Sequence, residues 1–174
     1  MKNQLRTIFT HVVLIFLAMA MSACGGGGGG SSSDPTVSQG RFVDAAVEGI
    51  TYTSGGQTGL TDVNGTFSYE TGQPVTFSIG GITIGTVTGS AIITPVQLVN
   101  NATDETDLVV TNIVQFLLTV DADHNSANGI QITQAIRDAA VGLNVNFNNA
   151  NFDFDGEVAV AVNALTTALE VTYL

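Results

Sequence analysis

The chain has 174 residues, of which 44% are hydrophobic and 11% charged, and its formal net charge at pH 7 is −11. This composition argues against intrinsic disorder, and the length is sufficient for one ordinary hydrophobic core. All fifteen acidic residues follow Cys24, where the only basic side chains are Arg41 and Arg137. The balance argues against nucleic acid or an anionic membrane surface as a partner, because both require clustered lysine or arginine. The acidity either keeps the domain soluble or serves a cation site.

Residues 1–23 have the layout of a secretory signal peptide. Lys2 and Arg6 give the start a positive charge, residues 12–21 contain no polar side chain, and two small residues follow. The apolar run is shorter than the roughly 20 residues that a helix needs to cross a bilayer. We therefore expect export and removal of this segment rather than a permanent transmembrane anchor.

The sequence Met-Ser-Ala-Cys at residues 21–24 resembles the lipobox of bacterial lipoproteins, except that Met21 stands where that family usually has leucine. The resemblance implies that Cys24 is acylated and becomes the mature N-terminus. Cys24 is also the only cysteine, so an exported chain could not use it in an internal disulfide. The alternative is ordinary cleavage after Ala23, which would leave a free N-terminal cysteine.

The residues after Cys24 predict where the protein is anchored and how. Gly25 stands where aspartate would imply retention in the inner membrane, so the resemblance implies the outer membrane, on its periplasmic or surface face. Acyl chains would then be the contact with the membrane. Residues 25–33 are six glycines and three serines, which form flexible coil. We therefore predict a lipidated cysteine and flexible linker over residues 24–39.

Residues 40–100 are expected to form short β-strands. Large apolar and aromatic residues alternate there with polar ones, and glycine pairs interrupt the pattern. Asn64-Gly65 predicts a tight turn with Gly65 at positive φ, joining a strand that ends near Thr61 to one that contains Phe67 and Tyr69. We expect these two strands to form a hairpin.

Residues 40–85 resemble the carboxypeptidase-regulatory-like, or transthyretin-like, β-sandwich. The resemblance implies an antiparallel sandwich that supports folding, display or binding and catalyses no reaction. Residues 74–85 depart from the pattern, since that family usually ends with a glycine-tyrosine strand, and the usual proline before the second glycine is also missing. The matching positions are Gly40, Asp44, Gly49, Thr61, Asp62, Gly65 and Phe67.

Residues 101–174 predict a helical unit of about three helices. The first covers residues 104–120, where Thr103 or Asp104 would cap its start, and the second covers residues 133–140 and ends before Gly142. The third begins after Asp155. Its expected buried stripe consists of Val158, Val162, Leu165 and Leu169. The predicted fold class is therefore α+β, a small antiparallel β-sandwich-like unit followed by helices, and the abrupt end at Leu174 suggests truncation of a longer protein.

Catalytic groups are scarce. His124 is the only histidine after the signal peptide, no lysine follows it, and Cys24 is used for acylation. Serine, cysteine and Schiff-base mechanisms therefore lack an activating group. A paired-carboxylate glycosidase needs only two acids, but the chain has no tryptophan and three tyrosines with which to bind a sugar. We expect a protein that is not an enzyme.

Two acidic segments could bind calcium, which prefers carboxylate, amide and carbonyl oxygens. Asp121, Asp123 and Asn125 have the spacing of positions 1, 3 and 5 of a calcium loop, although Gly129 comes too late for a regular EF-hand. The alternative is that Asp121 and Asn125 simply end a helix. The protein is thus expected to have no cofactor or to bind calcium.

The second segment contains Asn151, Asp153, Asp155 and Gly156. Val162 occupies the twelfth position, where a calcium loop needs a bidentate acid. The alternative role of Asp155 is to cap the helix that follows.

Together these patterns predict an envelope-anchored lipoprotein that acts as a noncatalytic display or binding module, with an envelope or extracellular protein as its partner. The alternative is a structural N-terminal spacer of a larger envelope protein. A paired-carboxylate hydrolase is a third and weaker interpretation.

Overall fold

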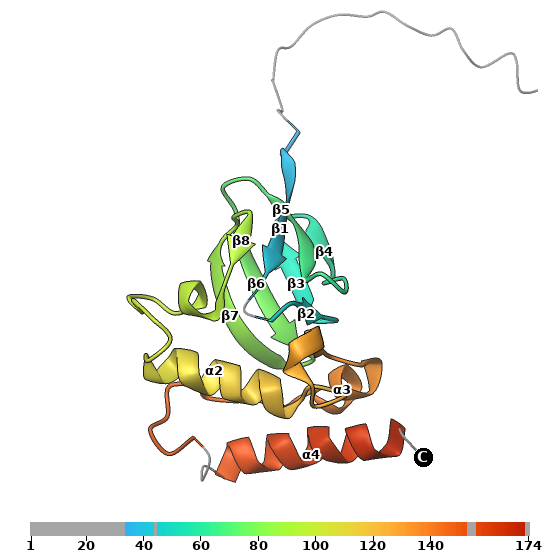
Figure 1. Cartoon of the computed structure of the whole chain (residues 1–174). Coiled ribbons are helices and arrows are strands. Elements are labelled where there is room, and N and C mark those ends of the chain that lie inside the picture. The colour runs from blue at the N-terminus through green and yellow to red at the C-terminus, as the bar shows by residue number, and fades with distance from the viewer. Residues whose placement is uncertain (1–33, 44, 153–155, 173–174) are drawn as a thin grey trace, which may run out of the picture. The chain divides into compact units, whose positions relative to one another are not determined.

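Two larger β-sheets, a small two-stranded sheet and the helices that close one end of them make up the described part of the chain (Figure 1). The structure, a computed structural model, describes residues 34–43, 45–152 and 156–172. The predicted signal peptide and Cys24 lie outside these residues, as do Asp44, Asp153 and Asp155. The predicted α+β class is confirmed, with mostly antiparallel sheets followed by helices.

The larger sheet has four antiparallel strands in the order β4-β3-β6-β7. Each strand pairs with its neighbour in sequence except where β3 meets β6, and the β6–β7 pair contains an irregularity between Phe77 and Ser78. The strands are β3 (Thr51–Ser54), β4 (Gln57–Leu60), β6 (Pro74–Ile79) and β7 (Ile82–Thr88).

The smaller sheet has three strands in the order β5-β1-β8, so the first strand of the fold lies in its middle. β1 pairs antiparallel with β5 and parallel with the short β8. The strands are β1 (Val37–Phe42), β5 (Thr66–Glu70) and β8 (Ile92–Ile93), the last followed by the 3-10 helix η1 (Pro95–Leu98).

Aromatic side chains fill the space between these two sheets. The ring of Phe77 on β6 stacks on Phe42 of β1 with centroids 4.9 Å apart, and the edge of Phe67 on β5 meets it at 5.1 Å. All three side chains are fully buried or nearly so. The alternation of apolar and polar residues that predicted the strands therefore places one face of each sheet in a shared interior, as in a sandwich.

The turn at Asn64-Gly65 is present, but the hairpin predicted around it is wrong. Gly65 has φ of 72° as expected. However, β4 pairs with β3, whereas β5 pairs with β1 of the other sheet. The two ends of the turn are held by different sheets, because Thr61 exchanges hydrogen bonds with Ile50 while the carbonyl of Gly65 accepts the N–H of Phe42. The turn therefore carries the chain across the sandwich.

A third, two-stranded sheet joins the β-rich part to the helical part. β2 (Val47–Glu48) pairs in parallel with β9 (Ile130–Gln131), so that Val47 lies opposite Ile130. The N–H of Ile132 extends the pairing by donating to the carbonyl of Glu48 at 3.0 Å. Segments more than eighty residues apart in the sequence thus lie side by side.

The three predicted helices are confirmed, although the first begins four residues later than expected. α2 (Leu108–Thr119) begins later than expected, because the carboxylate of Asp107 rather than Thr103 or Asp104 accepts the first free backbone N–H groups. Thr133 caps α3 (Gln134–Ala139) through its side chain. α4 (Gly156–Thr172) is the last element. No helix among the described residues is both long and apolar enough to span a membrane.

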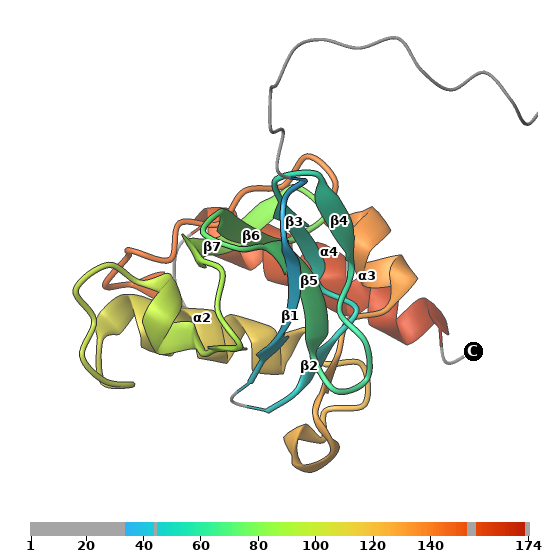
Figure 2. The ribbon, with the colours of Figure 1, turned by 90° about the horizontal axis from the view of Figure 1, so that it is seen from above.

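The helices pack in a layer beneath the strands. Figure 2 shows α2 and α3 at opposite ends of this layer, and Figure 1 shows α4 on the side of both that faces away from the strands. The buried stripe of α4 matches the prediction except that Ala161 is buried where Val162 is only partly so. Side chains of both halves of the chain belong to one continuous core.

A segment without regular structure connects α3 to α4 along the underside of α2. Val145, Phe147 and Phe152 are buried, and the ring of Phe147 lies 5.5 Å from that of Phe116 on α2. The amide nitrogen of the buried Asn112 donates to the carbonyl of Phe147 at 2.8 Å and to that of Asn149 at 3.0 Å. These side-chain hydrogen bonds attach the segment to α2, in place of the backbone hydrogen bonds that a strand would make with a neighbouring strand.

Asn112→Ala should lower the free energy of unfolding by about 2 kcal/mol, because it leaves carbonyl oxygens in a buried region without their donor. Urea unfolding followed by circular dichroism measures the change. Gln115→Ala, at an exposed position of the same helix, is the matched control and should have a much smaller effect. Equal losses in the two variants would show that Asn112 does not tie the segment to α2.

Candidate functional site

Several hollows of about 290 to 380 Å³ lie on the described surface, and two of them bear on ligand binding. One is a groove of about 380 Å³ between α2 and α4, a size within the range of small-molecule pockets. Phe116, Phe152 and Val158 form its apolar floor. The groove is also lined by Gln115, Thr119, Ala159, Val162, Asn163 and Thr166.

The rim of this groove is polar but uncharged. The hydroxyl of Thr119 donates to the carbonyl of Gln115 at 2.8 Å, and that of Thr166 donates to Val162 at 2.9 Å. These hydroxyls are therefore already used within their own helices. Among the described residues, no acid, base or nucleophile activated by a base lines the groove.

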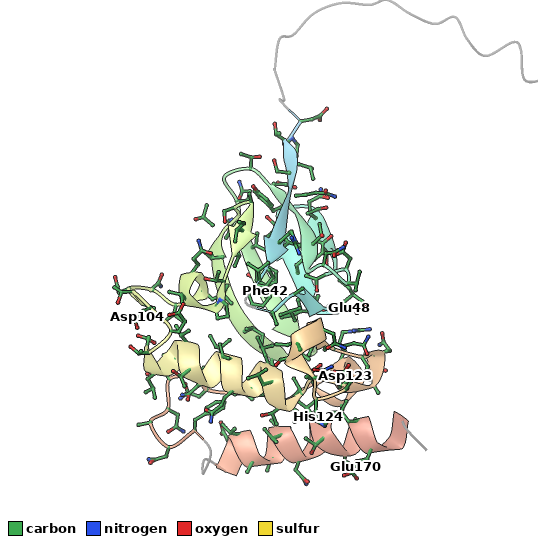
Figure 3. The ribbon with its side chains drawn as sticks, in the orientation of Figure 1. Phe42, Glu48, Asp104, Asp123, His124 and Glu170 are labelled. Atoms are coloured by element: carbon green, nitrogen blue, oxygen red, sulfur yellow. The ribbon has the colours of Figure 1, made fainter. Side chains whose placement is uncertain are left out.

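The second hollow lies beside the loop that connects α2 to β9. It has a volume of about 290 Å³, and the side chains of Glu48 and Asp123 both line it, together with Val63 and Asn128. Figure 3 shows Glu48 and Asp123 on the same side of the molecule, near β2. The sequence predicted Asp123 as a ligand residue but gave no sign of Glu48, which reaches the loop only because β2 pairs with β9.

The first predicted ligand residue, Asp121, is buried. Its side chain is 1% exposed, and its Oδ1 accepts the backbone N–H of Gln131 at 2.9 Å. The N–H of Ala122 donates to the carbonyl of Gln131 at 3.0 Å. These bonds attach the beginning of the loop to the edge of β9 and fix the position of the Asp121 carboxyl group.

The other oxygen of this carboxyl group is exceptional. Asp121 Oδ2 is the one buried side-chain nitrogen or oxygen atom in the described ranges that has no hydrogen-bond partner. Buried polar atoms in proteins are nearly always partnered, and an exception calls for an explanation such as an ion or a proton. Asp121 is therefore more than the end of a helix.

The second predicted residue, Asp123, is exposed and well bonded. Its Oδ2 accepts the side-chain amide of Asn128 at 2.7 Å, and its Oδ1 accepts the backbone N–H of Asn125 at 3.0 Å. These hydrogen bonds hold the pKa of Asp123 below its usual value, and the side chain of Asp121 lies close enough to contribute to the same shift. Asp123 is therefore a carboxylate at neutral pH.

The third predicted residue, Asn125, precedes the 3-10 helix η2 (Ser126–Asn128). Asp121 and Asp123 thus lie close together in the loop, and Asn125 follows two residues after Asp123. In the described ranges, no three His, Cys, Asp or Glu side chains are placed to hold a metal ion by themselves. A cation here would need neutral oxygens or water in addition to the two carboxyl groups.

The remaining candidates are more dispersed. Asp153 and Asp155 of the second acidic segment lie outside the described residues, and the N–H of Asn151 donates to the side chain of Asn149. His124 is exposed, with φ of 54°, and its backbone N–H donates to the carbonyl of Asp121. This geometry places the backbone of His124 in the turn that begins at Asp121.

Comparisons of the chain with known protein families, with curated proteins and with solved structures find no match.

Proposed function

We propose that this protein is a lipid-anchored module of the bacterial envelope that presents a folded, noncatalytic binding domain at the end of a flexible linker. The observation that carries the proposal is the order of features in the sequence: a signal peptide, the lipobox-like residues ending at Cys24, nine glycines and serines, and then the first strand at Val37. In order, these features correspond to export, acylation, a flexible linker and a folded domain.

Support for binding rather than catalysis comes from these two hollows. The groove between α2 and α4 has an apolar floor and no charged side chain among its described residues, which suits an apolar surface of an envelope or extracellular protein. The described residues that line the hollow beside the loop include the acids Glu48 and Asp123 but no histidine, lysine or cysteine that could serve as or activate a nucleophile. The resemblance of residues 40–85 to a noncatalytic β-sandwich supports the same conclusion.

Cys24→Ala should move the protein from the membrane pellet to the soluble exported fraction or leave it unprocessed, because retention rests on acyl chains at this residue. Cell fractionation and immunoblotting measure the distribution. Ser32→Ala in the linker is the control and should stay in the pellet. Release of the mature wild-type protein from membranes by salt alone would contradict the proposal, since salt weakens charge contacts but not insertion of acyl chains.

A further inference from the structure

The unpartnered oxygen of Asp121 lies at a place where a charge is costly. A carboxylate in a protein interior is destabilising unless hydrogen bonds or an opposite charge compensate it. Asp121 Oδ1 has one such hydrogen bond, from Gln131, whereas Oδ2 has no partner. The described chain places no hydrogen-bond donor at this atom, and the side chain of Asp123, which lies close to Asp121, is itself an acid.

The surroundings of Asp121 add negative rather than positive charge. Its neighbour Asp123 is an acid whose side chain lies close to it, and Glu48 lines the same hollow as Asp123. The two arginines of the described chain are engaged elsewhere. Arg137 donates to the carbonyls of Gly49 and Ile132, and Arg41 donates to the carbonyl of Asn64. No lysine follows Lys2, so the compensating charge has to come from solution.

We propose that Asp121 and Asp123 bind a calcium ion, which lies between Asp121 Oδ2 and the Asp123 carboxylate. Calcium takes six to eight oxygen ligands in flexible geometry, so two carboxylates can be completed by neutral oxygens of the loop and by water. Magnesium requires a stricter octahedron and is the poorer fit. The exposed Asp123 gives the ion access from the hollow, and the buried Asp121 gives it a fixed ligand. This inference is independent of the lipid anchor.

Binding at this loop would act on the junction of the fold. The loop connects the end of α2 to β9, and β9 is the strand that pairs with β2 of the β-rich part. An ion that holds Asp121 and Asp123 together therefore strengthens the attachment of the helices to the sheets. Calcium outside the cell is thereby expected to stabilise the whole domain.

The test compares melting temperatures of the full chain, purified in mild detergent, with a chelator, with 1 mM calcium and with 1 mM magnesium. Extracellular calcium sites have dissociation constants of about 0.1 to 1 mM, so calcium should raise the melting temperature by roughly 1 to 5 °C more than magnesium does. General screening of the acidic surface would be similar for the two ions. Equilibrium dialysis with radioactive calcium should show one saturable site.

Asp121→Asn separates this proposal from a purely structural role of Asp121. Asparagine keeps the oxygen that accepts from Gln131 and places an N–H donor where Oδ2 stands, facing Asp123. With the chelator present, this variant should therefore melt above the wild type, and it should lose the extra calcium shift. A residue needed only for structure would instead give a lower melting temperature.

Asp123→Asn is the second variant, because its exposed position lets the chain fold without it, and it should also abolish the difference between calcium and magnesium. Glu170→Gln removes the same charge from an exposed position of α4 (Figure 3), a different element from the loop, and should retain that difference. The proposal is wrong if the wild type shows no calcium preference. It is also wrong if Asp123→Asn keeps the preference.

Discussion

Phe77→Ala is expected to lower the free energy of unfolding by about 3–5 kcal/mol, the cost of removing a large aromatic side chain from a packed core. The side chain is fully buried and contacts the rings of Phe42 and Phe67, which come from the opposite sheet. Its removal would leave a cavity at the centre of the sandwich. Neither neighbour can fill it easily, because both are held by strands that pair along the backbone.

Guanidinium unfolding followed by circular dichroism measures this loss. Leu60→Ala is the control, because Leu60 is also a large apolar residue of a strand but is 48% exposed, and its truncation should cost less than about 1 kcal/mol. A similar loss in both variants would mean that the sheets do not pack through Phe77. A Phe77→Leu variant should recover part of the stability, since it refills most of the cavity.

Gly65→Ala should destabilise the protein by about 2–5 kcal/mol, from two separate causes. The residue has φ of 72°, a conformation that costs an alanine about 1–2 kcal/mol. In addition, a Cβ atom at this position would collide with the carbonyl oxygen of Phe42, so β1 or the turn would have to move. This turn carries the chain between the sheets, and a shift there would disturb both.

Gly72→Ala separates the two causes. Gly72 has a similar φ of 82°, but nothing lies within 4 Å of its added Cβ atom. Its substitution should therefore show the conformational cost alone, about 1–2 kcal/mol. The difference between the two variants, measured by chemical unfolding, gives the cost of the collision. Equal losses would place Gly65 farther from β1 than the structure has it.

Local sequence signals were sufficient for the individual elements. The alternation of residues such as Val75, Phe77 and Ile79 predicted strands, and the stripe that ends at Leu169 predicted a helix. Such signals depend on periodicity and on residues close in sequence. The start of α2 was misplaced because several residues between Thr103 and Asp107 could cap it, and only the packed structure selects Asp107.

The pairing of the strands could not be predicted from local sequence signals. β2, β8 and β9 have two residues each, too few for a periodic pattern, and they pair in parallel with partners far along the chain. The hairpin prediction failed for a related reason. An Asn-Gly turn indicates that the chain reverses, but the strands that receive its two ends are chosen by the hydrogen bonds of Thr61 and Gly65 with other segments.

The loop site was predicted in part. The spacing of Asp121, Asp123 and Asn125 identified the segment, but sequence alone could not distinguish a buried carboxyl group from an exposed one. The burial of Asp121 follows from its bond to Gln131, and Glu48 approaches because β2 lies beside β9. Both effects depend on the same nonlocal pair of strands, which is why the sequence did not reveal them.

The central position of β1 has a mechanical consequence. The residues that precede Val37 connect to the domain through this strand, which is hydrogen-bonded to β5 on one side and to β8 on the other. A force that pulls on that end acts along β1 and must slide it past both neighbours at once. Several hydrogen bonds then resist together, whereas a strand at the edge of a sheet could be peeled away one bond at a time. The domain can thus withstand tension applied at Val37 without unravelling from that end.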